Sequence, residues 1–561
     1  MDNLRLLNET QITYHRRRLE ELKKIRQPWE AEWCTLAEYI EPTRLRLSST
    51  PEGPRSRAKI IDGTGTHAYD TLKSGMHSGL TSPARPWFRL TTFDAGLKKV
   101  DAVKVYLAAV QDKMREVFAA SNIYRAFHIG YGDLGQFGQS CAILVEDRDT
   151  VIRVQQLVHG RFWIARDYKG RATTLYRVFR WSVQRIVERF GYNKVPNRVR
   201  QLYDTSKYGE CFDIYHAIEP RYDRDPDKID KRNKPFLSNY WMDEENSQLL
   251  EESGFDGNPI IAPSWELSDD NHYALSPGQK ALGDIKMLQL EQKRKLEALD
   301  KQLRPPMTGP TSMKNHPASL LPGSITYVDD PNRMGYRPAM EVRLNLSDLR
   351  EDIGEVQERV QRFFFADLFF AITNMEGVQP RNQLELTKRD EEKLLQLGPV
   401  LENVFGDQLG PTIDRTFDIL AARDELPPPP RELRGQELKV EYISTLAQAQ
   451  QAVSTGTIER GVAFIGQLAG ADPEALDKLD RDEAIDLYMD AIGAPPSLIR
   501  ADDKVKELRA SRAQQMQQAQ SAEMAATMAP ALNQGAQAAE LLASANQNPS
   551  GSALLQQLGI G

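Results

Sequence analysis

Two long amphipathic helices, separated by a proline-rich insert, constrain the fold of this chain more than any other feature of its sequence. The first is expected over 276–303, where Ser276 can cap the helix, Pro277 can occupy its first position and Gln279 can complete a capping box. The second is expected over 345–371. Its apolar residues recur at spacings of three and four and form one seam: Leu346, Leu349, Ile353, Val356, Val360 and Phe363. At about 1.5 Å per residue, each helix is on the order of 35 Å long.

The insert between these helices, residues 304–344, is rich in proline and glycine and contains one expected strand at 324–328. Long connections without regular structure are uncommon in compact domains and usually carry function. The insert therefore indicates a functional loop or an interaction surface at the far end of a helical pair.

The region before the pair, residues 1–275, is expected to mix helices with a smaller β-rich part. Helical patterns cover 10–40, with an interruption near Pro28, and then 101–121 and 122–138. The segment 140–180 is rich in β-branched and aromatic residues with turn signals between its runs, which predicts strands. A short amphipathic helix follows, with Ser182 as a possible cap and Gly191 at its end.

The region after the pair is expected to be mainly helical. A polar loop at 372–386 precedes a helical pattern at 387–421, which the tripeptide Leu-Gly-Pro breaks twice. Further helices are expected at 437–455, 457–469, 481–492 and 497–528. The chain as a whole is predicted to be mainly α, with a smaller α/β region near its N-terminus.

Composition narrows the class of protein. No apolar run approaches the roughly 18 to 20 residues that a membrane span needs. The N-terminus has no apolar core of a secretory signal, so we expect none. The three cysteines lie far apart without metal-ligand spacing, which is typical of a reducing compartment.

The net charge of −7 is unevenly distributed along the chain. Residues 169–200 hold nine Lys or Arg and one acid, whereas residues 472–490 hold eight acids and two bases. Aromatic residues alternate with the basic ones, a mix that can bind nucleic acid. The alternative, a solvated or subunit-facing surface with inward-pointing aromatics, is favoured. The two segments could also pair between neighbouring copies of the chain.

Motifs for chemistry are missing. The sequence has no phosphate-binding loop, no dinucleotide fingerprint, no H-E-x-x-H and no G-x-S-x-G. Asp223, Asp225 and Asp227 alternate as in a calcium loop, but Lys228 stands where that loop needs glycine. We therefore expect no catalytic site, no metal and no cofactor.

The stretch SPARPWF at 82–88 raises a separate question. Its two prolines end a helix and stiffen an elbow that presents Trp87 and Phe88. These rings could fill the core of the chain or contact a neighbouring chain, and the stretch alone does not decide.

The order of these parts resembles the head-to-tail connector, or portal, proteins of short-tailed, T7-like bacteriophages. The resemblance runs from about Trp33 to Arg512. It is carried by segments that keep the same order and spacing: WCTLAEYIEPTR (33–44), IIDGTGTHAYDTLKSGMHSGLTSPARPWFRL (60–90), RDYKGRATTLYRVFRWSVQRIVERFG (166–191), LSNYWMD (237–243), LLEESGFDGNPII (249–261), YALSPGQKALGDIKMLQ (273–289) and LQLGPVLENVFGDQLGPTIDR (395–415). Residues 372–386 and the tail from residue 513 onward match least well.

The resemblance implies a portal fold and a dodecameric ring at one capsid vertex of the virion, assembled in the host cytoplasm. Its parts would be a wing (1–275), two stem helices (276–303 and 345–371), a clip (304–344), a tunnel loop (372–386), a kinked helix returning to the wing (387–470) and a C-terminal helical crown (471–561). Double-stranded DNA would pass through the channel without sequence-specific contact. The expected partners are the packaging terminase, tail or adaptor proteins, and the capsid and scaffolding proteins.

Candidate residues follow from these parts. The second stem helix carries six acids against three arginines, which predicts a weakly repelling channel wall. The channel candidates are Glu351, Glu355, Gln379, Arg381 and Asn382. The candidates for subunit or wing contacts are Trp87, Phe88, Arg177 and Arg180, and those for docking at the clip are Lys314, His316 and Arg333. The alternatives are a DNA-packaging enzyme, either a nuclease or an ATPase, and a helical scaffold without a channel.

Overall fold

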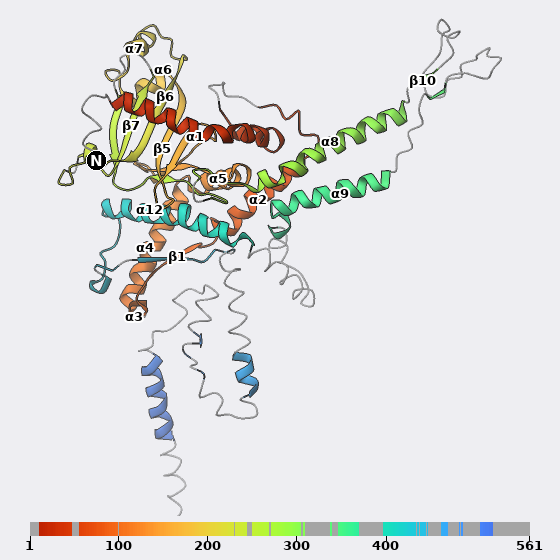
Figure 1. The fold of residues 1–561 in the computed structure, drawn as a ribbon. Coiled ribbons are helices and arrows are strands. Elements are labelled where there is room, and N and C mark those ends of the chain that lie inside the picture. Colours follow the sequence, from red (N-terminus) through yellow and green to blue (C-terminus); the bar gives the residue numbers. More distant parts are fainter. Residues whose placement is uncertain are drawn as a thin grey trace, which may run out of the picture. The chain divides into compact units, whose positions relative to one another are not determined.

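The fold was examined in a computed structural model of the 561-residue chain. The structure describes residues 11–47, 55–98, 100–228, 230–243, 249–268, 271–304, 307–308, 337–338, 346–369, 396–433, 435–436, 438–444, 446, 462–468, 479, 482, 484–485 and 505–519. The described residues are mostly helical, with antiparallel sheets confined to small groups of strands (Figure 1).

The elements follow one another in an order that mixes helices and strands up to residue 261 and is mainly helical afterwards. The first part contains α1 (Gln11–Tyr39), η2 (Pro42–Arg44), α2 (Thr64–Leu80), β1 (Phe88–Thr92), α3 (Ala95–Lys98), α4 (Asp101–Ala120), α5 (Ile123–Phe137), β2 (Ala142–Asp147), β3 (Val151–Gln156), β4 (Phe162–Arg166), β5 (Ala172–Ser182), α6 (Val183–Phe190), α7 (Asn197–Asp204), β6 (Cys211–Pro220), η3 (Lys231–Asn233), β7 (Phe236–Met242), β8 (Glu251–Phe255) and β9 (Ile260–Ile261). The second part contains α8 (Pro277–Leu303), β10 (Met307–Thr308), β11 (Arg337–Pro338), α9 (Leu346–Phe363), the π-helical turn η5 (Phe405–Leu409), α12 (Gly410–Ala422), η6 (Arg431–Leu433) and β12 (Leu438–Tyr442).

The largest sheet is five-stranded and antiparallel, in the order β4-β5-β6-β7-β8. Side chains alternate between its two faces, as the period of a strand requires. One face packs on α1 and the other on α6 and α7 (Figure 1). Because helices cover both faces, the aromatic residues of the β5 segment are drawn into two separate cores.

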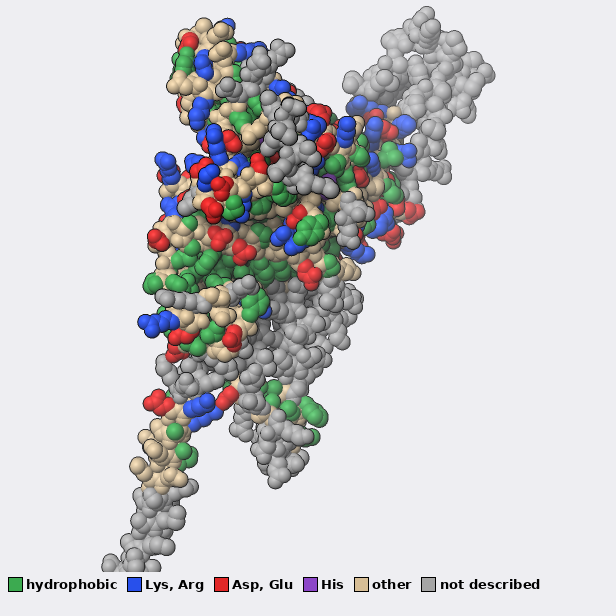
Figure 2. All heavy atoms as spheres, turned by 60° about the vertical axis from the view of Figure 1, so that its left-hand side comes forward, with side chains coloured by type: hydrophobic (Ala, Val, Ile, Leu, Met, Phe, Trp, Pro, Cys, Tyr) green, Lys and Arg blue, Asp and Glu red, His purple; other side chains and the backbone are tan. Residues whose placement is uncertain are grey.

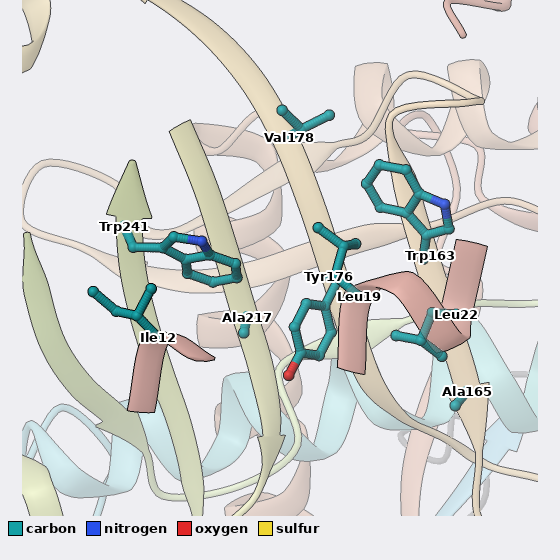
Figure 3. Packing of buried hydrophobic residues seen from close by; sticks show 9 residues of the cluster. All are labelled: Ile12, Leu19, Leu22, Trp163, Ala165, Tyr176, Val178, Ala217 and Trp241. Atoms are coloured by element: carbon teal, nitrogen blue, oxygen red, sulfur yellow. The ribbon is translucent and has the colours of Figure 1, made fainter. Parts of the chain in front are cut away.

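The core beneath α1 is built on large aromatic side chains. Figure 3 shows Trp163, Tyr176 and Trp241 rising from three strands toward Leu19 and Leu22 of α1. Each large apolar side chain buried in this way contributes roughly 1.5 to 3 kcal/mol relative to exposure. The start of the edge strand β4 is also protected by a side chain. Arg26 of α1 donates to the carbonyl oxygens of Gly160 and Phe162 at 3.0 and 2.7 Å.

A second, three-stranded sheet has the order β3-β2-β9. The side chain of Asn122, just before α5, caps its outer strand by bonding both the N–H and the carbonyl of Val154. Helix α5 packs closely on α2 through glycines. A Cβ at Gly135 would lie 2.6 Å from Leu72, so only glycine permits this approach.

Both long helices begin where the sequence predicts, to within one residue. Ser276 and Gln279 make the reciprocal capping box at the start of α8, and Pro277 is its first residue. Helix α9 begins at Leu346. Within the insert, the described residues form one antiparallel pair, β10 with β11; the expected strand at 324–328 lies outside the described residues.

The second long helix is not continuous over its expected length. Helix α9 ends at Phe363, because Phe365 adopts a positive φ of 54° that a right-handed helix excludes, and residues 366–369 are helical again. This bend also changes the seam. Phe363 is 37% exposed, and Phe364 is buried in its place.

Four other local expectations also need correction. Helix α1 continues through Pro28 without interruption; Pro28 is exposed, so the carbonyl that loses its partner can be hydrated. The second Leu-Gly-Pro does not break the helix either, because the π-helical turn η5 lets Gly410 N–H bond the carbonyl of Phe405. Residues 438–442 are not helical but form β12, which pairs with β1. Ser182 stands at the start of α6, but its side chain makes no capping bond.

The chain divides into two compact units. The first holds 1–91, 108–428 and 438–493, and with them both larger sheets and the α8–α9 pair. The second holds 92–107, 429–437 and 494–561. Its described residues include α3, the first turns of α4, η6 and a helical segment at 505–519.

Candidate functional site: the paired long helices and their surroundings

Helices α8 and α9 lie side by side and share one apolar seam (Figure 1). Leu288 of α8 packs against Ile353 and Val356 of α9, and all three side chains are at most 5% exposed. One ion pair adds to the seam, with Arg359 Nε at 3.4 Å from Asp284 Oδ2. In a single chain the pairing leaves one face of α9 and the second half of α8 exposed, whereas the first half of α8 also packs on α1 and α5.

The uncovered face of α9 is acidic. Its five carboxylates are all exposed: Asp348, Glu351, Asp352, Glu355 and Glu358. Figure 2 shows acidic side chains along one edge of this region, with some basic side chains among them. Glu351 and Glu355, the channel candidates on this helix, therefore point away from the seam, and this face can repel a polyanion.

The other candidates for DNA contact and docking cannot be placed. Gln379, Arg381 and Asn382, in the expected tunnel loop, lie outside the described residues. The same holds for the expected clip residues Lys314, His316 and Arg333.

The elbow residues Trp87 and Phe88 are buried within the chain. Their side chains are 2% and 0% exposed, and both rings contact Phe118 of α4. Trp87 Nε1 donates to the hydroxyl of Tyr124 at 3.4 Å. Of the two alternatives that the sequence left open, this burial favours the core, because neither ring is accessible to a neighbouring chain.

The basic segment 169–200 uses most of its arginines on its own fold. Arg185 lies over Trp181, and Arg189 lies over Phe190 and pairs with Glu251 at 2.9 Å. These rings belong to the core on the α6–α7 face of the sheet. The segment therefore matches the favoured alternative, in which the aromatics point inward, although Tyr192 remains 41% exposed.

The two contact candidates within this segment differ. Arg177 is half-buried and donates to His216 Nδ1 and Gln155 Oε1, both at 2.9 Å. Arg180 is exposed. Arg177 is thus a structural residue of the sheet, whereas Arg180 has a surface position that a neighbouring chain could reach.

A polar cavity of about 620 Å³ lies between the first half of α1 and the sheet. Its wall includes His15, whose Nδ1 is 2.8 Å from the Tyr176 hydroxyl and whose Nε2 is 3.0 Å from Asn239 Nδ2. Burial lowers the pKa of His15 to about 4, so the ring is neutral at pH 7. The charged residues around it pair with one another, for example Arg18 with Glu21 and Arg232 with Glu252. This arrangement stabilises the fold and offers no excess charge for a ligand.

Metal and membrane sites receive no support. Within the described ranges, no three His, Cys, Asp or Glu side chains converge where they could hold a metal ion. The Asp223–Asp227 loop is a set of turns, with Asp225 accepting from Asp227 N–H at 3.2 Å and pairing with Lys228. Among the described helices, none combines the length and apolarity that a membrane crossing requires.

One cluster between the loop before α2 and the middle of the helical pair was missed by sequence reasoning. Asp62, in the loop before α2, accepts hydrogen bonds from Gln292 of α8 and Gln357 of α9. The available signal was a pair of glutamines, Gln289 and Gln292, spaced by three on the otherwise apolar side of α8. That spacing shows that the two side chains are neighbours but not which loop they meet.

Comparisons with known proteins match this chain over most of its length. The profile of the bacteriophage head to tail connecting protein family matches residues 13–499. The chain is 41% identical over 502 residues to the portal protein of Salmonella phage epsilon15, covering 89% of this chain and 90% of that protein. It is 42% identical over 530 residues to the probable portal protein of Bordetella phage BPP-1, covering 93% and 94%.

Among solved structures, the chain is similar to the neck of an empty GTA particle computed with C6 symmetry. The TM-score is 0.36 at 14% identity, and the match covers 80% of this chain and 96% of that chain.

Proposed function

The chain belongs to the bacteriophage head to tail connecting protein family, and from this premise we propose that its copies form the portal ring at one vertex of a phage capsid. The observation that carries the proposal is the identity of 41 to 42% with two portal proteins over about nine tenths of the chain. The function is structural, and no catalysed reaction is assigned to the chain.

The proposed ring is a dodecamer whose channel passes double-stranded DNA into the head during packaging and out during ejection. The α8–α9 pair supports this assignment, because rods that share one seam and expose a second face can stack side by side around an axis. In this arrangement residues 1–275 would form the wing, 276–303 and 345–371 the stem, 304–344 the clip and 372–386 the tunnel loop. Residues 387–470 would form the kinked helix that returns to the wing, and 471–561 the crown.

The channel wall is proposed to include the acidic face of α9. A channel for DNA of any sequence must not read bases, and strong phosphate contacts would slow the passage of DNA. The exposed carboxylates of Glu351 and Glu355 meet that requirement by weak repulsion. Direct contacts are left to loop residues such as Gln379, Arg381 and Asn382.

The partners follow from the position at the vertex. The clip would bind the packaging terminase first and tail or adaptor proteins later, with Lys314, His316 and Arg333 as docking candidates. The wing would meet capsid and scaffolding proteins, and the exposed Arg180 is the accessible candidate for a contact between subunits. The ring would assemble in the host cytoplasm and remain in the virion.

Negative-stain electron microscopy of the purified full chain tests the proposal directly. We expect annular particles with a central hole, and a single subunit number by native mass spectrometry. Solitary particles or solid aggregates at every salt concentration would contradict a portal function. Assays of nucleotide hydrolysis and DNA cleavage on the same sample test the alternative of a packaging enzyme, for which we expect no activity above buffer.

A further inference from the structure

Gln289 of α8 binds the backbone of the loop that precedes α2. Gln289 Oε1 accepts from the backbone N–H groups of Ile61 and Asp62 at 2.6 and 2.8 Å. Its Nε2 donates back to the carbonyl of Asp62 at 3.0 Å. Gln289 is only 5% exposed, so these three bonds form away from competing water.

The side chain of Asp62 then joins both long helices. Its Oδ2 accepts from Gln292 Nε2 of α8 and from Gln357 Nε2 of α9, each at 3.0 Å. Its Oδ1 accepts from the backbone N–H of Thr64 at the start of α2, at 2.8 Å. One carboxylate therefore links three helices, and hydrogen bonds to a charged acceptor are stronger than neutral ones. We call Asp62, Gln289, Gln292 and Gln357 the Asp62 junction.

Helix α2 transmits this link to the body of the unit. A Cβ at Gly65, the second residue of α2, would lie 3.2 Å from Ile285 of α8. Further along, α2 packs on α5, where a Cβ at Gly132 would lie 2.4 Å from the hydroxyl of Tyr69. Because close-packed glycine contacts leave little room for the helices to slide past one another, α2 holds the helical pair in one orientation.

We propose that the Asp62 junction fixes the angle at which α8 and α9 leave the body of the subunit, and thereby the number of copies that close the ring. The inference rests on the proposed ring. In a closed ring, neighbouring copies differ by a rotation of about 30° for twelve copies and about 28° for thirteen. A change of only a few degrees in the angle between the helical pair and the body of the subunit is therefore enough to change the number of copies.

The test compares Asp62→Ala with Asp70→Ala. Asp70 is an exposed acid on α2, the helix that follows Asp62, so the control also removes one carboxylate but does not touch the junction. Ring composition is measured by native mass spectrometry, and ring diameter by electron microscopy. We expect one subunit number for the wild-type chain and for Asp70→Ala. Asp62→Ala should give a mixture of rings that differ by one or more subunits.

A second variant keeps the test open if Asp62→Ala fails to fold. The double change Gln292→Leu and Gln357→Leu retains Asp62 and leaves side chains of similar size but removes the two donors, and the same mixture is expected. Folded variants with the wild-type subunit number would overturn the proposal, even if their melting temperature were lower, because the junction would then only hold the fold. Wild-type protein without rings would instead contradict the proposed function.

Discussion

The neutral state of His15 follows from its surroundings. The ring is 2% exposed, stacks on Trp241 and lies between Tyr176 and Asn239. Burial penalises the charged form and lowers the pKa from 6.5 to about 4. The unfolded chain therefore takes up a proton at this residue between about pH 6.5 and pH 4, whereas the folded chain does not.

The stability of the chain should depend on pH through this residue. Between about pH 6.5 and pH 4 the free energy of unfolding should fall on acidification, and His15 accounts for up to about 1.4 kcal/mol per pH unit. His15→Gln should reduce that slope by about one proton, as measured by urea unfolding at several pH values. An unchanged slope in His15→Gln would show that the ring is protonated in the folded state.

The burial of Trp87 leads to a second prediction at this scale. Trp87→Ala removes a ring that is 2% exposed and stacked on Phe118, so we expect a loss of about 3 to 5 kcal/mol of folding stability. Thermal unfolding and soluble yield measure the loss. Tyr168→Ala, which removes an aromatic ring that is 92% exposed, should change stability by less than about 0.5 kcal/mol. A Trp87→Ala chain with the wild-type melting temperature and altered rings would place the residue at a subunit contact instead.

Single residues also show what the sequence could not predict. The capping box of Ser276 and Gln279 was predictable because its partners are three residues apart. The role of Asp62 was not, because its partners Gln292 and Gln357 are 230 and 295 residues away. Burial of Trp87 and exposure of Pro28 are likewise set by tertiary packing, which local propensity does not contain.

At the scale of elements, the seam of α9 was predictable over its first turns because it repeats at helical spacing. Its end was not, because the bend at Phe365 leads into packing against α2. Strand β12 was missed for a related reason. Its pairing with β1 joins residues about 350 positions apart, and a short segment of mixed propensity adopts the structure that its partner imposes.

Two glycines on these helices should respond to alanine in opposite directions. A Cβ at Gly75 of α2 would lie 2.2 Å from the ring of Phe369, so Gly75→Ala should destabilise the chain by about 1 to 3 kcal/mol. Gly283 on α8 has nothing within 4 Å of such a Cβ, so Gly283→Ala should stabilise it by up to about 1 kcal/mol. Denaturant unfolding of the pair measures both changes. Equal effects would mean that α2 and the residues after α9 do not pack as described.

At the scale of the whole molecule, the net charge of −7 and the acidic face of α9 suit the proposed channel, which must let DNA pass without binding it. Duplex DNA carries about one negative charge per 1.7 Å of its axis, and every lysine or arginine that neutralises a phosphate adds affinity. In the proposed channel, a wall of exposed carboxylates around such a polymer would keep it from adhering. Because free charges are screened over about 8 to 10 Å in physiological salt, the effect acts only at close range.

Reversing charge on this face should therefore slow the passage of DNA without preventing assembly. Glu351→Lys combined with Glu355→Lys creates two phosphate contacts in every copy. We expect rings of wild-type size by electron microscopy but several-fold less DNA protected from nuclease per unit time in a packaging assay. Raising the salt concentration should restore part of the rate, because phosphate contacts weaken as counterions are added.

The matched control places the same charges elsewhere. Asp112→Lys combined with Glu116→Lys changes two exposed acids, also four residues apart, on α4. If α9 lines the channel, this variant packages at the wild-type rate, since its charges do not meet DNA. Two outcomes would argue against a channel-facing α9. Equal slowing in both variants would point to a general effect of net charge, and loss of rings only in the α9 variant would assign its acidic face to contacts between subunits.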